Sequence, residues 1–93
     1  MAVLTTNEIQ RKLGSIKGWS FSNNQLEKEF ILKDFISAIK LINEIAVPSE
    51  EMNHHPDILI YGWNKVRVTI STHSEGGVTE NDFILASKID GLI

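Results

Sequence analysis

The fold is decided by residues 57–73, which read DILIYGWNKVRVTISTH. Residues 57–61 form a short apolar run with two isoleucines, and this composition predicts a largely buried strand. Residues 62–65 read as a turn, and from 66 to 73 apolar and polar residues alternate, as in a strand with one buried face. Two strands joined by so short a turn predict a β-hairpin, and His73 ends that hairpin on its polar face.

A long helix is predicted before this hairpin. Asp34 is a good N-cap, and the apolar residues after it recur at helical spacing. They are Phe35, Ala38, Ile39, Ile42, Ile45 and Ala46. Ile36, Leu41 and Val47 add apolar surface off this stripe, which indicates either a second protein surface or deep burial. Pro48 removes a helical hydrogen bond, so the helix should end or kink near Val47, or a fresh turn should start at Pro48.

The remaining elements are marked by caps and turns. A capping-box pattern at Thr5 predicts a short first helix, and a similar pattern at Thr79 opens a last one. Residues 19–21 and 26–32 flank an Asn-Asn turn and predict a second hairpin. The order is therefore α-β-β-α-β-β-α. We expect an α+β fold in which helices cover one face of a four-stranded antiparallel sheet.

Composition restricts the class of protein. The chain has 93 residues, which corresponds to a single domain spanning residues 1–93. It has no cysteine, which excludes a disulfide scaffold and fits a reducing compartment such as the cytoplasm. A formal net charge of −3 and the lack of a Lys/Arg cluster argue against a nucleic-acid partner. The chain shows no signal-peptide pattern and no run of membrane-spanning length, so no membrane partner is expected.

All three histidines lie between Glu50 and His73. Unperturbed imidazoles are the only side chains of this sequence that titrate close to neutral pH. Pro56 disfavours the α region for His55, so His54 and His55 should lie where a helix gives way to extended chain. Neighbouring side chains of extended chain point apart, and the two imidazoles are therefore expected to face different directions.

Three interpretations of these histidines compete. They are surface, capping and turn residues that fall close together, or metal ligands, or general acids and bases. Adjacent histidines are poorly placed to hold one ion, and the chain has neither an HExxH pattern nor a cysteine to complete a ligand shell. We therefore predict no metal and no cofactor. Two or three imidazoles around one small substrate would instead donate and accept protons.

The sequence around the histidines resembles the pterin-4a-carbinolamine dehydratases. The shared motifs are Glu50-x-x-x-His54-His55-Pro56, Trp63-Asn64-Lys65-Val66, Ser71-Thr72-His73 with Gly76-Gly77, and Thr79-x-x-Asp82 with Leu85-Ala86-x-x-Ile89. The likeness extends over nearly the whole chain through Gly18-Trp19 and Phe30-x-x-Lys33-Asp34-Phe35. Pro48 departs from the family pattern, which carries helix-compatible residues just before the acidic residue.

The resemblance implies an enzyme that dehydrates 4a-hydroxytetrahydrobiopterin to the quinonoid dihydropterin and so recycles tetrahydropterin. It also implies the same α+β architecture, assembly into dimers or tetramers, and a functional link to an aromatic amino acid hydroxylase. The alternative is a non-catalytic dimerisation or binding module, because family members also serve as dimerisation partners of a transcription factor. A pterin-binding protein without turnover is a further alternative.

The resemblance also suggests roles for single residues. His54 and His55 are predicted to include the acid and the base, while His73 holds the pterin and assists. Glu50 would orient His54 and favour its protonated form by charge. A pure scaffold has no physical need for these four residues together, and their presence favours the enzyme.

Three further residues are candidates for substrate binding. Asp82 is interpreted first as a helix cap and second as part of the site. Trp63 would flank the flat pterin, although aromatic residues at strand ends more often belong to the core. Gly76 would let backbone amides approach the pterin, or would only turn the chain.

Overall fold

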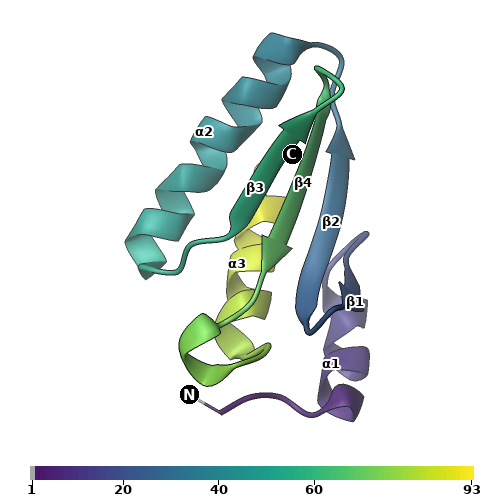
Figure 1. The fold of residues 1–93 in the computed structure, drawn as a ribbon, viewed down its shortest axis with the longest axis vertical. Coiled ribbons are helices and arrows are strands. Elements are labelled where there is room, and N and C mark those ends of the chain that lie inside the picture. The colour runs from purple at the N-terminus through teal and green to yellow at the C-terminus, as the bar shows by residue number, and fades with distance from the viewer. Residues whose placement is uncertain (1) are drawn as a thin grey trace.

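A four-stranded antiparallel sheet forms the centre of the structure, a computed structural model that describes residues 2–93. Its strands are β1 (Ser20–Ser22), β2 (Gln25–Ile31), β3 (Asp57–Tyr61) and β4 (Lys65–Ile70). They lie in the order β1-β2-β4-β3, with Leu26 opposite Ile70 and Ile58 opposite Val68 (Figure 1). Both predicted hairpins are present, and β3 is an edge strand.

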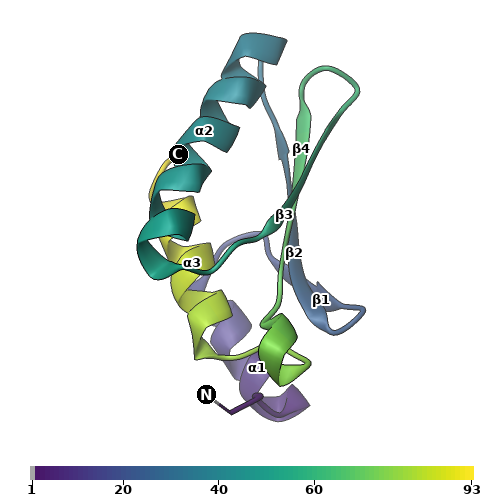
Figure 2. The same cartoon turned by 60° about the vertical axis from the view of Figure 1, so that its left-hand side comes forward.

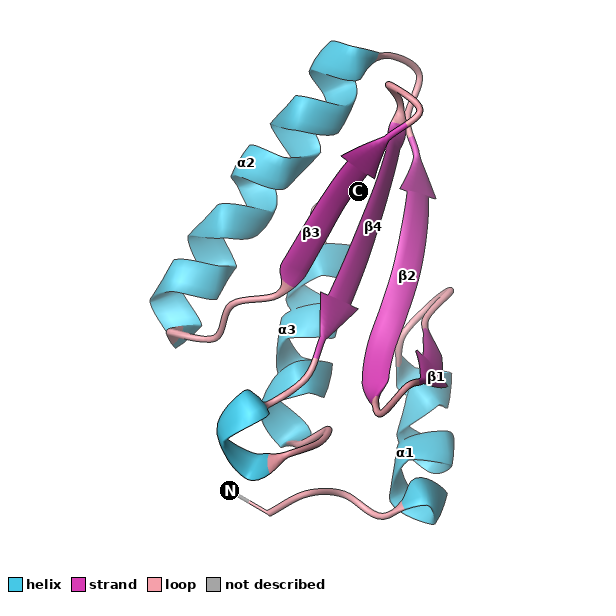
Figure 3. Ribbon diagram, in the orientation of Figure 1, coloured by secondary structure: helices cyan, strands magenta, loops and turns pink. Residues whose placement is uncertain are grey.

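All the helices of the described chain lie on one face of this sheet. They are α1 (Thr6–Lys12), α2 (Phe35–Met52) and α3 (Glu80–Asp90), with two 3-10 turns, η1 (Leu13–Ser15) and η2 (His73–Glu75). Figure 2 shows the sheet nearly edge-on, with the helices on one side and the other side open. The predicted α+β order is confirmed (Figure 3). No helix within residues 2–93 combines the length and the apolar character needed to cross a membrane.

The core lies between the sheet and the helices. Alternate residues of β4 point inward and are fully buried, as the pattern of residues 66–73 predicts. The buried apolar side chains of the sheet are Leu26, Phe30, Val66, Val68 and Ile70, and those of α2 and α3 include Ala38, Leu41, Ile45, Leu85, Ala86 and Ile89. Lys28 shares the inward face of β2, and its amino group hydrogen-bonds Asp90 at 2.9 Å.

The long helix differs from its prediction at Pro48. Helix α2 continues through Pro48 for another turn, up to Met52, where the sequence predicts an end, a kink or a fresh turn near Val47. Pro48 and Ser49 are both buried, and the Ser49 hydroxyl donates to the carbonyl of Ile45 at 2.8 Å. Burial of Pro48 and Ser49 and the extra hydrogen bond offset the one that proline cannot make, so tertiary packing overrides the local preference.

Candidate active site

The histidine pair, His54 and His55, lies between the end of α2 and the start of β3. Asn53 adopts the left-handed conformation with φ of 49°, which stops the helix. The backbone N–H groups of Asn53 and His54 then donate to the carbonyls of Glu50 and Ser49, at 3.1 and 3.0 Å. This is the hydrogen-bond pattern of a Schellman motif with asparagine in place of glycine. His54 and His55 follow in extended chain before β3, as Pro56 predicts.

His54 is held by a buried carboxylate of α3. Its Nε2 lies 2.6 Å from Oδ1 of Asp82, and the two side chains are 11% and 0% exposed. Asp82 also accepts at Oδ2 from the backbone N–H of Thr79 at 2.7 Å, which confirms its predicted role as a cap of α3. The same carboxylate therefore caps a helix and orients an imidazole. Among residues 2–93, none forms a hydrogen bond with Nδ1 of His54.

Glu50 has a different partner from the one predicted. Its Oε1 lies 2.6 Å from Nε2 of His55, so it orients His55 and not His54. The reason is the end of α2 at Asn53. His54 lies outside the helix and no longer shares a face with Glu50, which sits one turn before the end. This pair is open to solvent, with the His55 and Glu50 side chains 56% and 77% exposed.

His73 is presented by a closed loop next to the same carboxylate. Thr72, the residue before it, donates its hydroxyl to Asp82 Oδ2 at 2.9 Å, and its backbone pairs with Gly77. His73 then begins η2 and is exposed, and Gly76 ends this turn with φ of 77°. In Figure 1 this loop and the end of α2 both lie at the lower end of β3 and β4. The structure thus gathers the three histidines at one end of the sheet.

Trp63 lies at the other end. It occupies the turn between β3 and β4, whereas His55 precedes β3, so the five residues of that strand separate them. At about 3.3 Å per residue this amounts to roughly 17 Å. Trp63 is 62% exposed and adopts a left-handed backbone with φ of 59°. Within one chain it does not join the histidines, and its predicted place beside the substrate stays a prediction.

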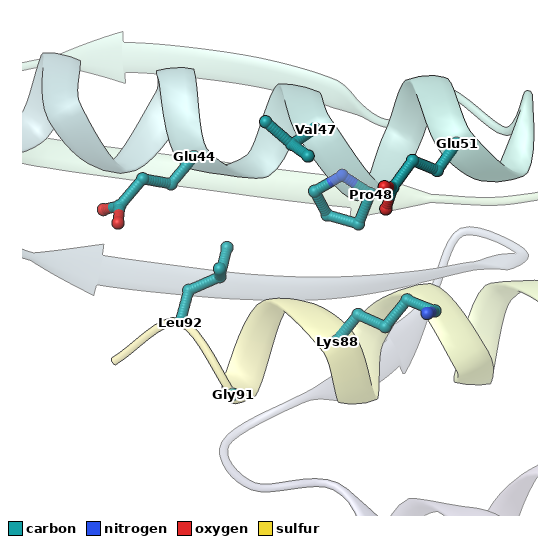
Figure 4. A pocket seen from close by; sticks show the side chains of 7 residues that line it. All are labelled: Glu44, Val47, Pro48, Glu51, Lys88, Gly91 and Leu92. Atoms are coloured by element: carbon teal, nitrogen blue, oxygen red, sulfur yellow. The ribbon is translucent and has the colours of Figure 1, made fainter.

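A groove between α2 and α3 is separate from this site. Its volume is about 450 Å³, and Pro48 and Val47 face Lys88 and Leu92 across it (Figure 4). No histidine lines it. The candidate chemistry therefore lies outside this groove, at the end of the sheet. In the part of the chain that the structure describes, no three His, Asp or Glu side chains are arranged to hold a metal ion.

Two residues of the site have no separate place in the sequence-based prediction. The hydroxyls of Thr72 and Thr79 lie 2.7 Å apart, and both residues are buried beside Asp82. Alternation along β4 places Thr72 on the buried face, and the capping-box pattern places Thr79 next to Asp82 in space. A polar residue on a buried face requires a hydrogen-bond partner. The position of Thr72 on that face was therefore the signal in the sequence that could have pointed to its bonds with Thr79 and Asp82.

Comparison with known proteins gives one family. The family described as pterin 4 alpha carbinolamine dehydratase matches residues 2–92. A relative named for this dehydratase from Sulfolobus acidocaldarius is 51% identical over 87 residues, which is 94% of each chain. Another, from Picosynechococcus, is 44% identical over 96% of each chain.

Two solved structures share the fold. A crystal structure from Brucella melitensis, titled as a transcriptional coactivator/pterin dehydratase, has a TM-score of 0.91 and 34% identity, with 97% of both chains covered. A pterin dehydratase-like protein identified as a RuBisCO assembly factor has a TM-score of 0.63 at 24% identity, covering 80% of this chain and 84% of its own. This second likeness concerns the fold alone.

Proposed function

The chain belongs to the pterin-4a-carbinolamine dehydratase family, and from this premise we propose that it dehydrates 4a-hydroxytetrahydrobiopterin to the quinonoid dihydropterin by histidine acid/base catalysis. One observation carries the mechanism. Two adjacent imidazoles each pair through Nε2 with a carboxylate at the same end of the sheet, and the exposed turn that carries the third imidazole lies at that end too. A paired carboxylate orients an imidazole and stabilises the charge that it gains on taking a proton.

The reaction needs two proton transfers and no change of oxidation state. A proton passes to the 4a-hydroxyl, which leaves as water when the carbon–oxygen bond breaks. The neighbouring ring N–H gives up its proton, and its electron pair forms the carbon–nitrogen double bond. We assign these two transfers to His54 and His55 between them. Acid/base catalysis of this kind contributes roughly 10²- to 10⁴-fold to a rate.

The remaining residues hold the substrate and the histidines. Asp82 and Glu50 orient His54 and His55 respectively, and His73 contributes to pterin binding from its exposed turn. A Cβ atom added at Gly76 would meet no other atom within 4 Å, so a flat ligand can approach the backbone there. We place the enzyme in the cytoplasm, next to a hydroxylase that supplies the carbinolamine.

The decisive experiment follows decay of the carbinolamine with and without the purified protein. His54→Ala and His55→Ala should each slow the catalysed reaction by on the order of 10²-fold or more. The thermal midpoint of His55→Ala should change little, because its pair with Glu50 is exposed. His54→Ala removes a hydrogen-bond partner from the buried Asp82 carboxylate and should lower the thermal midpoint, so its turnover is compared at a temperature at which the variant is folded. Wild-type turnover by a folded His54, His55 double variant would contradict the mechanism. Dialysis against a metal chelator should leave turnover unchanged, since the proposed steps involve only imidazoles.

We also propose that the chain self-associates as a dimer or tetramer. The stripe of α2 that faces away from the sheet exposes Phe35, Ile36, Ile39 and Val47. Strand β3 is at an edge, and among the described residues its backbone pairs only with β4. Exposed apolar surface and a free strand edge both favour association. Sedimentation at micromolar concentration should show a species larger than one chain.

A binding module is the second candidate. The solved structure from Brucella melitensis is titled a transcriptional coactivator/pterin dehydratase, and the same exposed stripe of α2 would serve a protein partner. The carbinolamine assay separates the two, because a module without turnover leaves the decay at its uncatalysed rate. Loss of turnover in the histidine variants together with unchanged sedimentation would assign chemistry and association to different surfaces.

A further inference from the structure

We propose that Thr72 is a positioning residue that sets up both His54 and His73. Its hydroxyl completes the hydrogen bonding of Asp82, the carboxylate that holds His54, and its backbone closes the loop that presents His73. This inference rests on the proposed function, because it concerns how the same site is kept ready for proton transfer.

The hydroxyl protons of Thr72 and Thr79 each have one possible direction in this network. An ionised carboxylate only accepts hydrogen bonds, so the Thr72 hydroxyl must donate to Asp82 Oδ2 across their 2.9 Å. A hydroxyl has one proton. The 2.7 Å contact between the two threonine oxygens must therefore run from Thr79 to Thr72. All protons of the network thus point toward Asp82.

This arrangement decides the tautomer of His54. Oδ2 of Asp82 is occupied by Thr72 and by the backbone N–H of Thr79, which leaves Oδ1 for the ring. Oδ1 accepts from Nε2 of His54, so Nε2 carries the proton of the neutral ring. From residue 2 to residue 93 the only buried side-chain polar atom without a partner is Asn64 Oδ1. The unpartnered Nδ1 of His54 therefore reaches solvent and is the nitrogen that meets the substrate.

Burial makes this hydroxyl difficult to replace. Thr72 is 8% exposed, and Thr79 and Asp82 are fully buried. When the Thr72 hydroxyl is removed, Oδ2 of Asp82 loses a donor in a place with little room for water. The carboxylate is then held only by the Thr79 N–H and the His54 ring, so the orientation and the tautomer of His54 lose one of their supports.

The backbone of Thr72 acts on the second histidine. Its N–H donates to the carbonyl of Gly77 at 2.9 Å, and its carbonyl accepts from the N–H groups of Glu75 and Gly76, each at 3.0 Å. These bonds close the turn that begins at His73. One residue thus fixes the carboxylate behind His54 with its side chain and the loop of His73 with its main chain.

The test compares three substitutions. Thr72→Val keeps the shape and the strand preference but removes the hydroxyl, and it should lower kcat by roughly 10-fold or more with a smaller change in KM. Thr72→Ser keeps the hydroxyl and should restore most of kcat. Thr69→Val, three residues earlier in β4, is the matched control, because the Thr69 side chain faces the open side of the sheet and makes no hydrogen bond within residues 2–93. It should behave as wild type.

A second measurement does not depend on turnover. Nitrogen-15 NMR of the imidazole rings distinguishes the tautomers, and wild-type His54 should carry its proton on Nε2. Thr72→Val should raise the share of the other tautomer, while Thr69→Val should leave the spectrum unchanged. Wild-type kcat and an unchanged ring spectrum in Thr72→Val would overturn the proposal, as would an Nδ1–H tautomer in the wild type. Absence of carbinolamine turnover in the wild type contradicts the proposed function instead, and the ring spectra still decide the role of Thr72.

Discussion

Helix α3 carries a carboxylate near each end, and the two are held in different ways. Asp82 is the third residue of the helix, and Asp90 is its last. Around Asp82 the donors are a threonine hydroxyl, a backbone N–H and an imidazole. Around Asp90 they are the Lys28 ammonium, the Trp19 indole and the backbone N–H of Lys17, at 2.9, 2.9 and 3.1 Å.

The helix itself explains why Asp90, but not Asp82, has a permanent cation as a hydrogen-bond partner. The first turn of a helix attracts negative charge, so Asp82 is stabilised there by neutral donors. The last turn repels negative charge, and Asp90 has the charge of Lys28 beside it. Lys28 is fixed in turn by the carbonyl of Lys17 at 2.6 Å and lies 4.8 Å above the ring of Phe30.

This difference assigns Asp82 to the candidate active site and Asp90 to the stability of the fold. The network of Asp82 ends on an imidazole whose second nitrogen makes no hydrogen bond within residues 2–93, and an imidazole both donates and accepts hydrogen bonds. The network of Asp90 ends on an ammonium and an indole, which only donate hydrogen bonds. We therefore expect substitutions at Asp82 to affect turnover and substitutions at Asp90 to affect stability.

Asp82→Asn should produce the largest effect. The amide keeps the size of the side chain but offers its NH2 group as well as its oxygen, so it can hold the wrong tautomer of His54. Turnover of the carbinolamine should fall by roughly 10²- to 10⁴-fold, the range in which an imidazole loses its catalytic tautomer. Asp90→Asn is the control in the same helix. Turnover within twofold of wild type for Asp82→Asn would remove the distinction between the two ends.

Part of this site could be predicted from the sequence because it follows from local rules. The capping-box pattern places Asp82 at the start of α3, and Pro56 places the histidines in extended chain. The alternation of β4 predicts which of its side chains face the core. Each of these patterns involves only a few neighbouring residues. The predictions from them are correct because the tertiary structure favours the same local conformations.

The remaining part depends on contacts between distant segments. The pairing of His54 with Asp82 joins residues 28 positions apart, and that of Lys28 with Asp90 joins residues 62 apart. The assignment of Glu50 to His54 was wrong because a single left-handed residue, Asn53, ends the helix between them. Local rules left an end, a kink or a fresh turn open at Pro48, and the helix continues there up to Met52. The burial of Pro48 and Ser49 that favours this continuation is not visible in local preferences.

Asp90→Asn should have a smaller effect, and on a different property. The carboxylate accepts from three groups while its side chain is 20% exposed, so the neutral amide should lower the free energy of unfolding by about 1–3 kcal/mol. Urea unfolding at neutral pH measures this directly. Glu27→Gln, on the open face of β2, is the control and should change stability by less than about 0.5 kcal/mol. Turnover of folded Asp90→Asn should match wild type, and a large loss would place Asp90 in the site.

The smallest expected effect is the pH dependence of that stability difference, and its sign follows from Asp90. Burial alone raises the pKa of this carboxyl, but hydrogen bonds from Lys28, Trp19 and the Lys17 backbone outweigh it and hold the pKa below its ordinary value of 3.8. The folded state then binds fewer protons than the unfolded state in acid. The stabilisation from Asp90 is complete above its ordinary pKa and is lost as the pH falls through the lower folded value.

The wild type and Asp90→Asn should therefore converge in acid. Urea unfolding of both at neutral pH and at about pH 3 should show a smaller difference in unfolding free energy at the lower pH. Glu8 and Asp34 also have a lowered pKa, through hydrogen bonds with the backbone of Thr5 and the side chain of Ser37 respectively. They are present in both proteins and cancel in the difference. A difference that grows on acidification would mean that Asp90 is protonated more readily in the folded chain, and Lys28 would then not be the charge that holds it.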